Sequence, residues 1–453
     1  MTSVAPRTQE PKVSLPLPGP ASRVLLERQA ERESNARTYP RRLQIAVKRG
    51  AGSYVEDLDG NVFIDFLTGA GVLGLGHNHP EIVDAVRRQL GEFCHGLDLP
   101  TEIKDEFTSV QLGLLPESMR ERTKIQFCGP TGANAVDAAL KLCKTATGRS
   151  EVVAFSGAFH GSTHAAMAVT GWVAQKEPVA NNMHGVHFFP FPYAYRWPVT
   201  LDPESCAEQC LHALESALKD PLGGIPKPAA VIMEPIQAEG GVIVPPREFV
   251  QGVRQLTREL EIPLIVDEIQ TGCGRTGTWF AFEQFEIEPD VILVSKGLGG
   301  IGMPIAIVMY DRELDTWGPG AHTATFRGNQ LAFAAGVASA NIIQRDGVLE
   351  NVRRQGEYLL DELRSLQTEH PAIGDVRGLG LMVGFEMIDP ETGAPDGAVA
   401  QRIQRLALER GLILELGGRY DAVVRMLPPL NVSRETLDQA LEITRDAVAE
   451  ACA

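Results

Sequence analysis

Between about residues 125 and 310, short apolar runs rich in Val and Ile alternate with longer stretches of helical period. Continuous apolar runs bounded by helices are typical of strands buried on both faces, as in a parallel sheet. The pattern therefore predicts an α/β fold with a largely parallel sheet. The seven runs are Lys124–Cys128, Glu151–Ser156, Gly185–Phe189, Ala229–Glu234, Pro263–Asp267, Asp290–Ser295 and Pro304–Tyr310.

The two ends of the chain follow different patterns. Alternating apolar positions around Asp59-Gly60-Asn61 predict a hairpin from Tyr54 to Phe66. Residues 328–370 have a helical pattern, and a smaller mixed sheet with two helices is expected after them. The segments of that part are Gly380–Glu386, Leu412–Leu416 and Val423–Leu427 as strands, and Ala398–Arg410 and Ser433–Ala451 as helices.

Together these patterns predict two domains. The large domain has a mostly parallel sheet flanked by helices, and the smaller α+β domain is built from both chain ends. We expect a mobile Pro-rich tail at 1–20, small-domain segments at 21–80 and 336–453, and the large domain at 81–335.

Size and charge narrow the classes of partner. The chain has 453 residues, of which 44% are hydrophobic, so a large core is available. The net charge of −16 argues against nucleic acids and anionic membranes as partners, and anionic substrates would need a locally basic site. No apolar run approaches twenty residues, and the N-terminus lacks the apolar core of a signal peptide. The seven cysteines show no metal-ligand spacing, which favours reduced thiols in the cytoplasm and no metal.

Two of the predicted strands end in residues that can carry chemistry. One delivers Lys296 to a Gly-rich segment, and the other ends in Asp267. A pyridoxal-phosphate (PLP) enzyme needs such a pair, because the lysine forms the Schiff base and the acid pairs with the pyridinium nitrogen. Many α/β proteins also have strands that end in Asp or Lys, so the pair alone is a weak signal.

Three other segments strengthen the prediction of cofactor binding. The turn at Gly129–Leu140 follows a strand and opens a helix, and its Gly132 allows a phosphate to approach the backbone N–H groups. The turn is neither a Walker A loop nor a dinucleotide fingerprint, and an ordinary strand–helix turn is the alternative. Phe159 follows the next strand and could stack on a flat heterocycle, whereas His160 alone is more often an ordinary loop histidine. Thr325 offers a hydroxyl beside a second helix N-terminus.

Several motifs, in order, make the chain similar to the class III (ω-amino acid) aminotransferases from about Ala21 to its end. This resemblance implies PLP fold type I. The matching motifs are Gly76-His-Asn-His-Pro80, Phe159-His-Gly161, Glu234-Pro235, Asp267-Glu-Ile-Gln270, Ser295-Lys-Gly297 and Thr325–Asn329.

The resemblance also implies roles for single residues. Lys296 would form the Schiff base and move the proton, and Asp267 would pair with the ring nitrogen. Thr325 would reach the phosphate from the neighbouring subunit, which implies a homodimer. Further cofactor contacts are implied for Phe159, His160, Gln270 and the backbone of Gly132 and Ala133.

The substrate question depends on a second set of residues. Glu239 and Arg425 match the family's Glu/Arg switch, in which the arginine grips the α-carboxylate of glutamate and otherwise pairs with the acid. Ser162 stands where some 4-aminobutyrate transaminases have an arginine that reads a distal carboxylate.

Narrower resemblances favour the diaminobutyrate–2-oxoglutarate transaminases, which make L-2,4-diaminobutyrate from L-aspartate 4-semialdehyde and glutamate. They lie at Ala30–Pro40, Gly129–Val136, Pro190–Pro198 and Leu412–Arg419. Phe191, Ala194 and Trp197 depart from the usual residues of the third segment. The alternatives are another ω-amino acid or diamine transaminase, of the 4-aminobutyrate or ornithine type, and an aminomutase or racemase of the same fold. A mutase has less use for a Glu/Arg switch, and an intact Lys296 with Asp267 argues against a non-catalytic binding protein.

Overall fold

A seven-stranded sheet forms the centre of the computed structural model, which describes residues 10–179, 184–197 and 202–453. The strand order is β4-β10-β9-β8-β7-β5-β6. The neighbours from β9 to β6 pair in parallel, and β10 is antiparallel to both β4 and β9. All seven predicted apolar runs lie in this sheet, as β4 (Thr123–Phe127), β5 (Val152–Phe155), β6 (Val186–Phe189), β7 (Ala230–Met233), β8 (Leu264–Asp267), β9 (Val291–Val294) and β10 (Ile307–Asp311).

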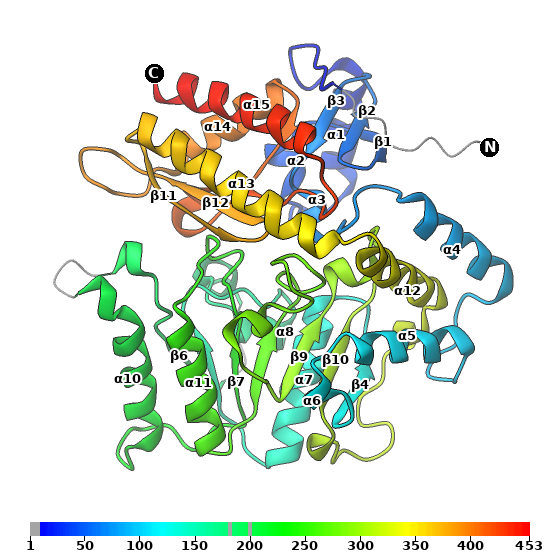
Figure 1. The fold of residues 1–453 in the computed structure, drawn as a ribbon, viewed down its shortest axis with the longest axis vertical. Coiled ribbons are helices and arrows are strands. Elements are labelled where there is room, and N and C mark those ends of the chain that lie inside the picture. Colours follow the sequence, from blue (N-terminus) through cyan, green and yellow to red (C-terminus); the bar gives the residue numbers. More distant parts are fainter. Residues whose placement is uncertain (1–9, 180–183, 198–201) are drawn as a thin grey trace.

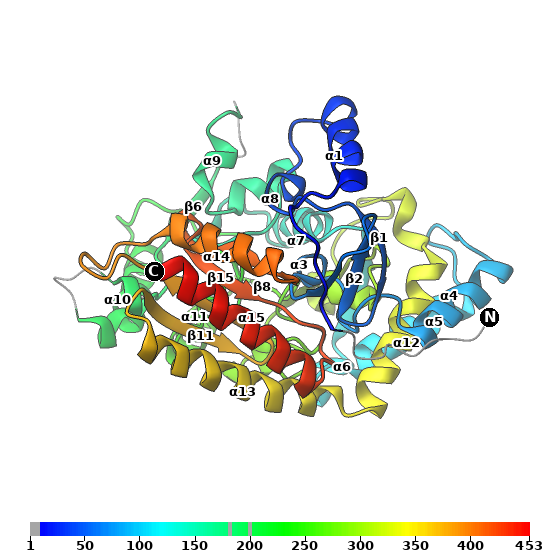
Figure 2. The ribbon, with the colours of Figure 1, turned by 90° about the horizontal axis from the view of Figure 1, so that it is seen from above.

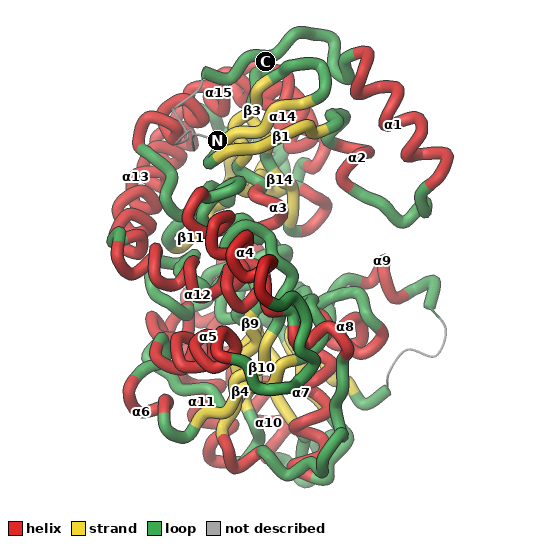
Figure 3. Tube along the Cα trace, turned by 90° about the vertical axis from the view of Figure 1, so that its right-hand side faces the viewer, coloured by secondary structure: helices red, strands yellow, loops and turns green. Residues whose placement is uncertain are grey.

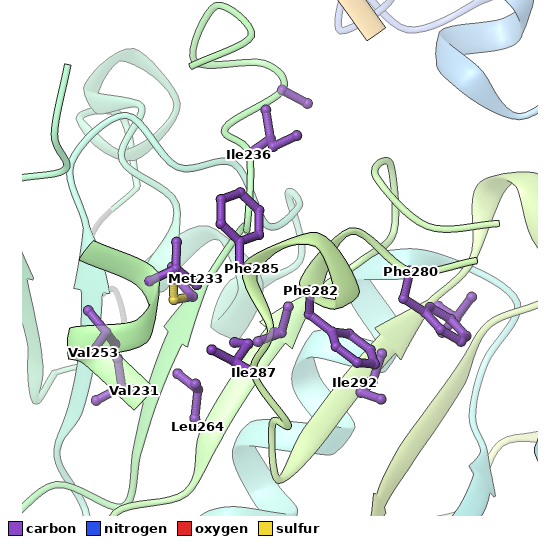
Figure 4. Close-up of a cluster of buried hydrophobic side chains, with 14 of the residues drawn as sticks. Val231, Met233, Ile236, Val253, Leu264, Phe280, Phe282, Phe285, Ile287 and Ile292 are labelled. Atoms are coloured by element: carbon purple, nitrogen blue, oxygen red, sulfur yellow. The ribbon is translucent and has the colours of Figure 1, made fainter. Parts of the chain in front are cut away.

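Successive residues of the central strands enter opposite hydrophobic clusters, which explains the continuous apolar runs. Val231, Met233 and Leu264 belong to the cluster in Figure 4, which α11 (Arg247–Glu259) also enters. Ile232 and Ile265 belong to a second cluster on the other face, shared with α7 (Gly132–Thr147) and α8 (His164–Val169). Further helices that enter the first cluster include α5 (Glu102–Gly113), α10 (Cys206–Lys219) and α12 (Gln330–Arg345).

The two ends of the chain meet above the large sheet, where the blue and red segments of Figure 1 lie together. β13 (Leu412–Ile413), from the C-terminal part, pairs in parallel with β3 (Val62–Asp65) of the predicted hairpin. The sheet is completed by β1 (Val47–Ala51) and β2 (Tyr54–Asp57), in the order β1-β2-β3-β13. The backbone of Lys12 pairs with Val62 of β3.

A third sheet, with the order β11-β12-β15-β14, is antiparallel throughout. Its strands are β11 (Ile373–Leu379), β12 (Met382–Met387), β14 (Glu415–Gly417) and β15 (Val423–Met426). The prediction of one mixed sheet was wrong here, because the segment Leu412–Leu416 breaks at Leu414 and its halves join different sheets. The buried side chains of Leu412, Leu414 and Leu416 all belong to one hydrophobic cluster, so the break does not interrupt the core.

Long helices cover the small sheets. In Figure 2, α14 (Gly397–Glu409) and α15 (Arg434–Cys452) lie side by side, and α13 (Val348–Glu369) runs beside β11. None of the helices in the described ranges is both long and apolar enough to cross a bilayer. The predicted tail at 1–20 falls partly on residues 1–9, outside the described residues, and the domain boundaries remain predictions. The remaining α-helices are α1 (Pro20–Arg32), α2 (Tyr39–Arg42), α3 (Thr68–Gly71), α4 (Pro80–Glu92), α6 (Glu117–Arg120) and α9 (Val173–Lys176).

Candidate active site

Asp267 ends β8 and Lys296 closely follows the neighbouring parallel strand β9, so both lie at the carboxyl ends of their strands, and both line the same cavity. Ligands of open α/β sheets bind at such strand ends. Lys296 has φ of +37°, in the left-handed region that a residue with a side chain seldom adopts, so its backbone is held under strain. Burial lowers the pKa of the Lys296 amine. This shift is toward the neutral amine, which is the nucleophilic form.

Asp267 is buried and is fixed by two hydrogen bonds. His160 Nδ1 donates to Asp267 Oδ2 at 2.7 Å, and the Ile269 N–H donates to Oδ1 at 3.0 Å. The Thr170 hydroxyl accepts from the His160 backbone N–H, and His160 Nε2 is a buried atom with no hydrogen-bond partner among the described residues. The sequence singled out both residues but gave no sign that they pair, because 107 positions separate them.

The turn at Gly132 and Ala133 begins α7 and lines the same cavity. A Cβ atom at Gly132 would lie 2.9 Å from two side-chain carbons of Ile269, so glycine leaves the backbone room beside that residue. Thr131 caps the helix together with Asn134, which leaves the following N–H groups directed toward the cavity end of the helix. The turn can therefore receive an anion such as a phosphate.

Phe159 lines the cavity and is held at its backbone by an acid. Glu234, which follows β7, accepts hydrogen bonds from the N–H groups of Phe159 (2.9 Å) and Ala238 (3.0 Å). Burial raises the pKa of Glu234 to about 7. The Phe159 ring packs at a tilt against Trp172, with centroids 5.2 Å apart. Sequence reasoning matched Glu234 to a motif but missed that it fixes the loop of the aromatic residue.

Arg425, on β15, is fully buried and forms the predicted pair with Glu239. Arg425 Nη2 lies 2.6 Å from Glu239 Oε2, and Gln270 Nε2 donates to Glu239 Oε1 at 3.0 Å. Burial alone would raise the pKa of Glu239, but Arg425 and Lys296 outweigh it and lower that pKa. Burial opposes the charge on Arg425, but Glu239 and Glu415 raise its pKa. Both groups of the pair are therefore charged.

Glu415 is a second acid beside Arg425, and the sequence analysis did not identify it. It lies opposite Arg425 in the register of β14 and β15, and its Oε2 is 3.0 Å from Arg425 Nη2. The Tyr39 hydroxyl, on α2, donates to Glu415 Oε1 at 3.0 Å. The only available signal was the position of Glu415 within the segment Leu412–Arg419, which cannot give the strand register.

A wider cavity adjoins the first and includes Lys296, Glu239 and Phe159 in its lining. It extends between α2 and α9, which lie on the same side of the molecule in Figure 3. Ser162 is exposed on its wall, and its hydroxyl donates to Gln175 Oε1 at 3.4 Å. The structure thus brings Ser162 to the outer part of the site and away from the buried group around Asp267.

Apart from the fully buried Arg425, Thr325 is the one predicted site residue that lines neither of these two cavities. It is exposed, and its backbone carbonyl accepts a hydrogen bond from His95 Nε2 at 2.7 Å. The neighbouring Phe326 is 65% exposed and packs edge-on against His95. A contribution of Thr325 to a site would therefore need a second subunit.

The sequence matches the family described as aminotransferase class III over residues 35–448. The chain belongs to this family, and the predicted enzyme class is confirmed. Aminotransferases of this class use PLP and act on amino and keto acids, so the predictions of cofactor and general substrate class are confirmed at the family level.

Two relatives are similar over most of their length. The chain is 48% identical to a diaminobutyrate–2-oxoglutarate aminotransferase of Rhizobium meliloti, over 91% of this chain and 90% of the relative. It is 44% identical to a protein of the same name from Haemophilus influenzae, over 94% and 95%.

Solved structures confirm the predicted fold class. An amine transaminase from an uncultivated Pseudomonas species, described in its PLP-bound internal aldimine form, matches with a TM-score of 0.84 and 26% identity, over 93% of this chain and 98% of that one. An (S)-enantioselective ω-transaminase from Thermomicrobium roseum matches with a TM-score of 0.87 and 26% identity, over 95% and 99%.

Proposed function

We propose that this enzyme transfers an amino group between L-glutamate and 2-oxoglutarate on one side and an ω-amine on the other. The proposed ω-reaction converts L-aspartate 4-semialdehyde to L-2,4-diaminobutyrate. The observation that carries the proposal is the buried pair of Arg425 and Glu239 beside Lys296. The names of the two relatives support the choice of diaminobutyrate.

The residues of the inner cavity fit PLP. Lys296 would bind the cofactor covalently, Asp267 would hold its ring nitrogen, and Phe159 would cover the ring. The backbone N–H groups at Gly132 and Ala133 would hold the phosphate, and Gln270 would contact the ring's phenolic oxygen. The buried, unpartnered Nε2 of His160 is a further polar atom in this cavity that a ligand could satisfy.

When bound, PLP withdraws electrons from the substrate carbon that bears the amino group. The protein residues supply the rest of the chemistry. The Lys296 amine, with its lowered pKa, takes a proton from that carbon as a general base. Asp267, oriented by His160, would present its carboxylate to the ring nitrogen.

The Glu239–Arg425 pair lets one site accept two kinds of amine. For glutamate, Glu239 moves away and Arg425 receives the α-carboxylate with its planar fork of donors. For an ω-amine, which has no carboxylate beside the reacting carbon, Glu239 neutralises Arg425. An unpaired buried charge is costly. Glu239 therefore stays paired with Arg425 when the substrate has no carboxylate to replace it.

A homodimer is the proposed minimal unit. The exposed Thr325, next to the exposed Phe326, supports a site completed by a second subunit. Thr325 of each chain would then contact the phosphate in the other chain.

The proposed function is tested by incubating the purified holoenzyme with L-2,4-diaminobutyrate and 2-oxoglutarate. We expect glutamate to form in equal amount to the diamine consumed, and the reverse reaction to consume glutamate when aspartate 4-semialdehyde is supplied. A panel of 4-aminobutyrate, ornithine and β-alanine provides the comparison. Faster turnover of any of these than of diaminobutyrate would reject diaminobutyrate as the substrate, whereas failure of every ω-amine would reject ω-transamination.

A further inference from the structure

Two carboxylates lie beside Arg425. Glu239 and Glu415 both form ion pairs with Arg425 Nη2, at 2.6 and 3.0 Å, so two carboxylates share one guanidinium. Arg425 is fully buried, and the side chains of the two acids are 15% and 9% exposed. Lys296 also acts on both acids and lowers their pKa, yet the pKa of Glu415 stays above its ordinary value, so a further cation would stabilise the charged form of this carboxylate.

Glu415 is the acid with an unused acceptor. Its Oε1 accepts the Tyr39 hydroxyl, whereas its Oε2 is buried and receives no hydrogen bond, although it lies near Arg425. An ionised carboxylate has about four lone-pair positions, so Glu415 can accept further donors. Glu239, in contrast, already accepts from both Gln270 and Arg425.

Glu415 also lies where a substrate would pass. Together with Lys296 it lines the wider cavity, and Tyr39 lies on the same wall. Burial, together with the nearby Glu239, raises the pKa of Glu415, and a cation bound at this carboxylate would reverse that effect. Such a cation can come from the cavity that Glu415 lines.

We propose that Glu415, held by Tyr39, binds an ammonium group at the far end of the ω-amine substrate. This inference rests on the proposed function and names its specificity determinant. The enzyme would thereby select ω-amines whose other end is an α-amino acid over those that end in a carboxylate alone. Diaminobutyrate carries such an ammonium group and 4-aminobutyrate does not.

The choice of an ammonium follows from the chemistry of the wall. Asp421, another acid in the lining of the wider cavity, is already paired with Arg42 at 2.6 Å, so it does not compete for the cation. A compact ammonium with three donors can bridge a carboxylate oxygen and a hydroxyl oxygen, and Tyr39 provides the latter. A metal ion is less suited, since only one carboxylate there has an open oxygen.

The test measures single half-reactions of the holoenzyme from the change in cofactor absorbance. Two pairs of amines differ only in the α-ammonium: diaminobutyrate with 4-aminobutyrate, and ornithine with 5-aminovalerate. In the wild type we expect the diamino acids to react with the higher kcat/KM. Glu415→Gln should lower kcat/KM for both diamino acids by about 10- to 100-fold, the loss expected for a hydrogen bond to a charged group, and leave the monoamines within about threefold.

Matched variants separate recognition from structural support. Asp421→Asn removes a carboxylate from the same cavity and should leave the ratio of kcat/KM between each pair unchanged. Tyr39→Phe should lower the ratio less than Glu415→Gln does, and Glu415→Asp, which keeps the charge, should restore part of it. Glu415→Asp also serves as the test if Glu415→Gln does not fold.

Three outcomes would overturn the inference. Equal losses on both members of each pair in Glu415→Gln, with an unchanged ratio, would mean that Glu415 only supports Arg425. A wild type that reacts with 4-aminobutyrate and 5-aminovalerate but with neither diamino acid would reject ammonium recognition while ω-transamination stands. A wild type that reacts with no ω-amine would reject both proposals together.

Discussion

Asp267 shows how much a single residue can say before a structure is known. Its place at the end of an apolar run predicted a buried acid at the carboxyl end of a strand, and the structure puts it there, in the same cavity as Lys296. Its partner was not predictable, because His160 comes from a loop 107 positions earlier. The same holds for Arg425: the sequence suggested one acidic partner, Glu239, and strand register added a second, Glu415.

Asp267→Asn should retain the cofactor but lower kcat by at least about 100-fold, because a neutral amide cannot stabilise a protonated ring nitrogen. The measurement combines cofactor absorbance with steady-state turnover. His160→Gln, which keeps a donor toward Asp267, should have a smaller effect. Turnover near the wild-type value in Asp267→Asn would remove the residue from its proposed role.

Arg425→Lys should keep the buried charge but lose the planar fork that suits a carboxylate. We expect the glutamate half-reaction to slow by about 10- to 100-fold, and the ω-amine half-reaction by much less, because only glutamate uses the fork. Rapid-mixing absorbance measurements of both half-reactions provide the check, with the exposed Arg364→Lys on α13 as control. Equal slowing of the two half-reactions would argue against the switch.

At the scale of elements, the start of α7 and the end of β8 meet at one point. A Cβ atom added at Gly132 would lie only 2.9 Å from the side chain of Ile269, the second residue after Asp267. The phosphate turn and the acid are therefore packed against each other, and a change in one shifts the other.

Gly132→Ala should weaken PLP binding by about tenfold, because the added methyl group displaces Ile269 or the turn. The dissociation constant can be measured by titrating the apoenzyme with PLP. Gly113→Ala, on α5, is the matched control, since a Cβ there meets no atom within 4 Å. An unchanged dissociation constant for Gly132→Ala would show that the turn tolerates the displacement.

Glu268, directly after β8, predicts a pH dependence of stability. Burial raises its pKa to about 7 from an ordinary value near 4.5. The folded state then binds more protons than the unfolded state between these pH values, so this contribution is complete below about pH 4.5 and is lost as the pH rises through 7. The slope is at most about 1.4 kcal/mol per pH unit.

Glu268→Gln should flatten this part of the stability curve, because glutamine does not titrate. Its amide can still accept from the Phe282 N–H and donate to the Thr271 hydroxyl, so the local hydrogen bonds are kept. The measurement is the free energy of unfolding from pH 5 to 8. Glu234 has a similarly raised pKa and keeps its share of the slope. The exposed Glu369→Gln should leave the slope unchanged, and an equal slope in Glu268→Gln and wild type would contradict the assignment.

At the scale of the whole molecule, the two chain ends form a cap over the sheet that carries the cofactor residues (Figure 1). Tyr39 and Arg425 come from this cap, and Lys296 and Asp267 come from the large sheet. A single chain still leaves Thr325 outside its own cavities. The complete site would thus require the sheet, the cap and a second copy.

Thr325→Ala should weaken PLP affinity about tenfold without changing the fold, because one phosphate hydrogen bond from the partner would be lost. The nearby exposed Thr323→Ala is the control. The wild-type enzyme should also release PLP more readily when it is diluted below the dimer dissociation constant. Unchanged affinity in Thr325→Ala, or affinity independent of dilution, would separate Thr325 from the phosphate.

The sequence by itself determined the seven strands of the large sheet and the positions of Lys296 and Asp267. It could do so because burial on both faces leaves a continuous apolar run, whose last residue marks the carboxyl end of the strand. Only the tertiary structure decided which side chains meet: Tyr39 and Glu415 are 376 positions apart, and Glu415 faces Arg425 through strand register. Charge partners depend on distances of a few ångströms in space, and these distances leave no pattern along the chain.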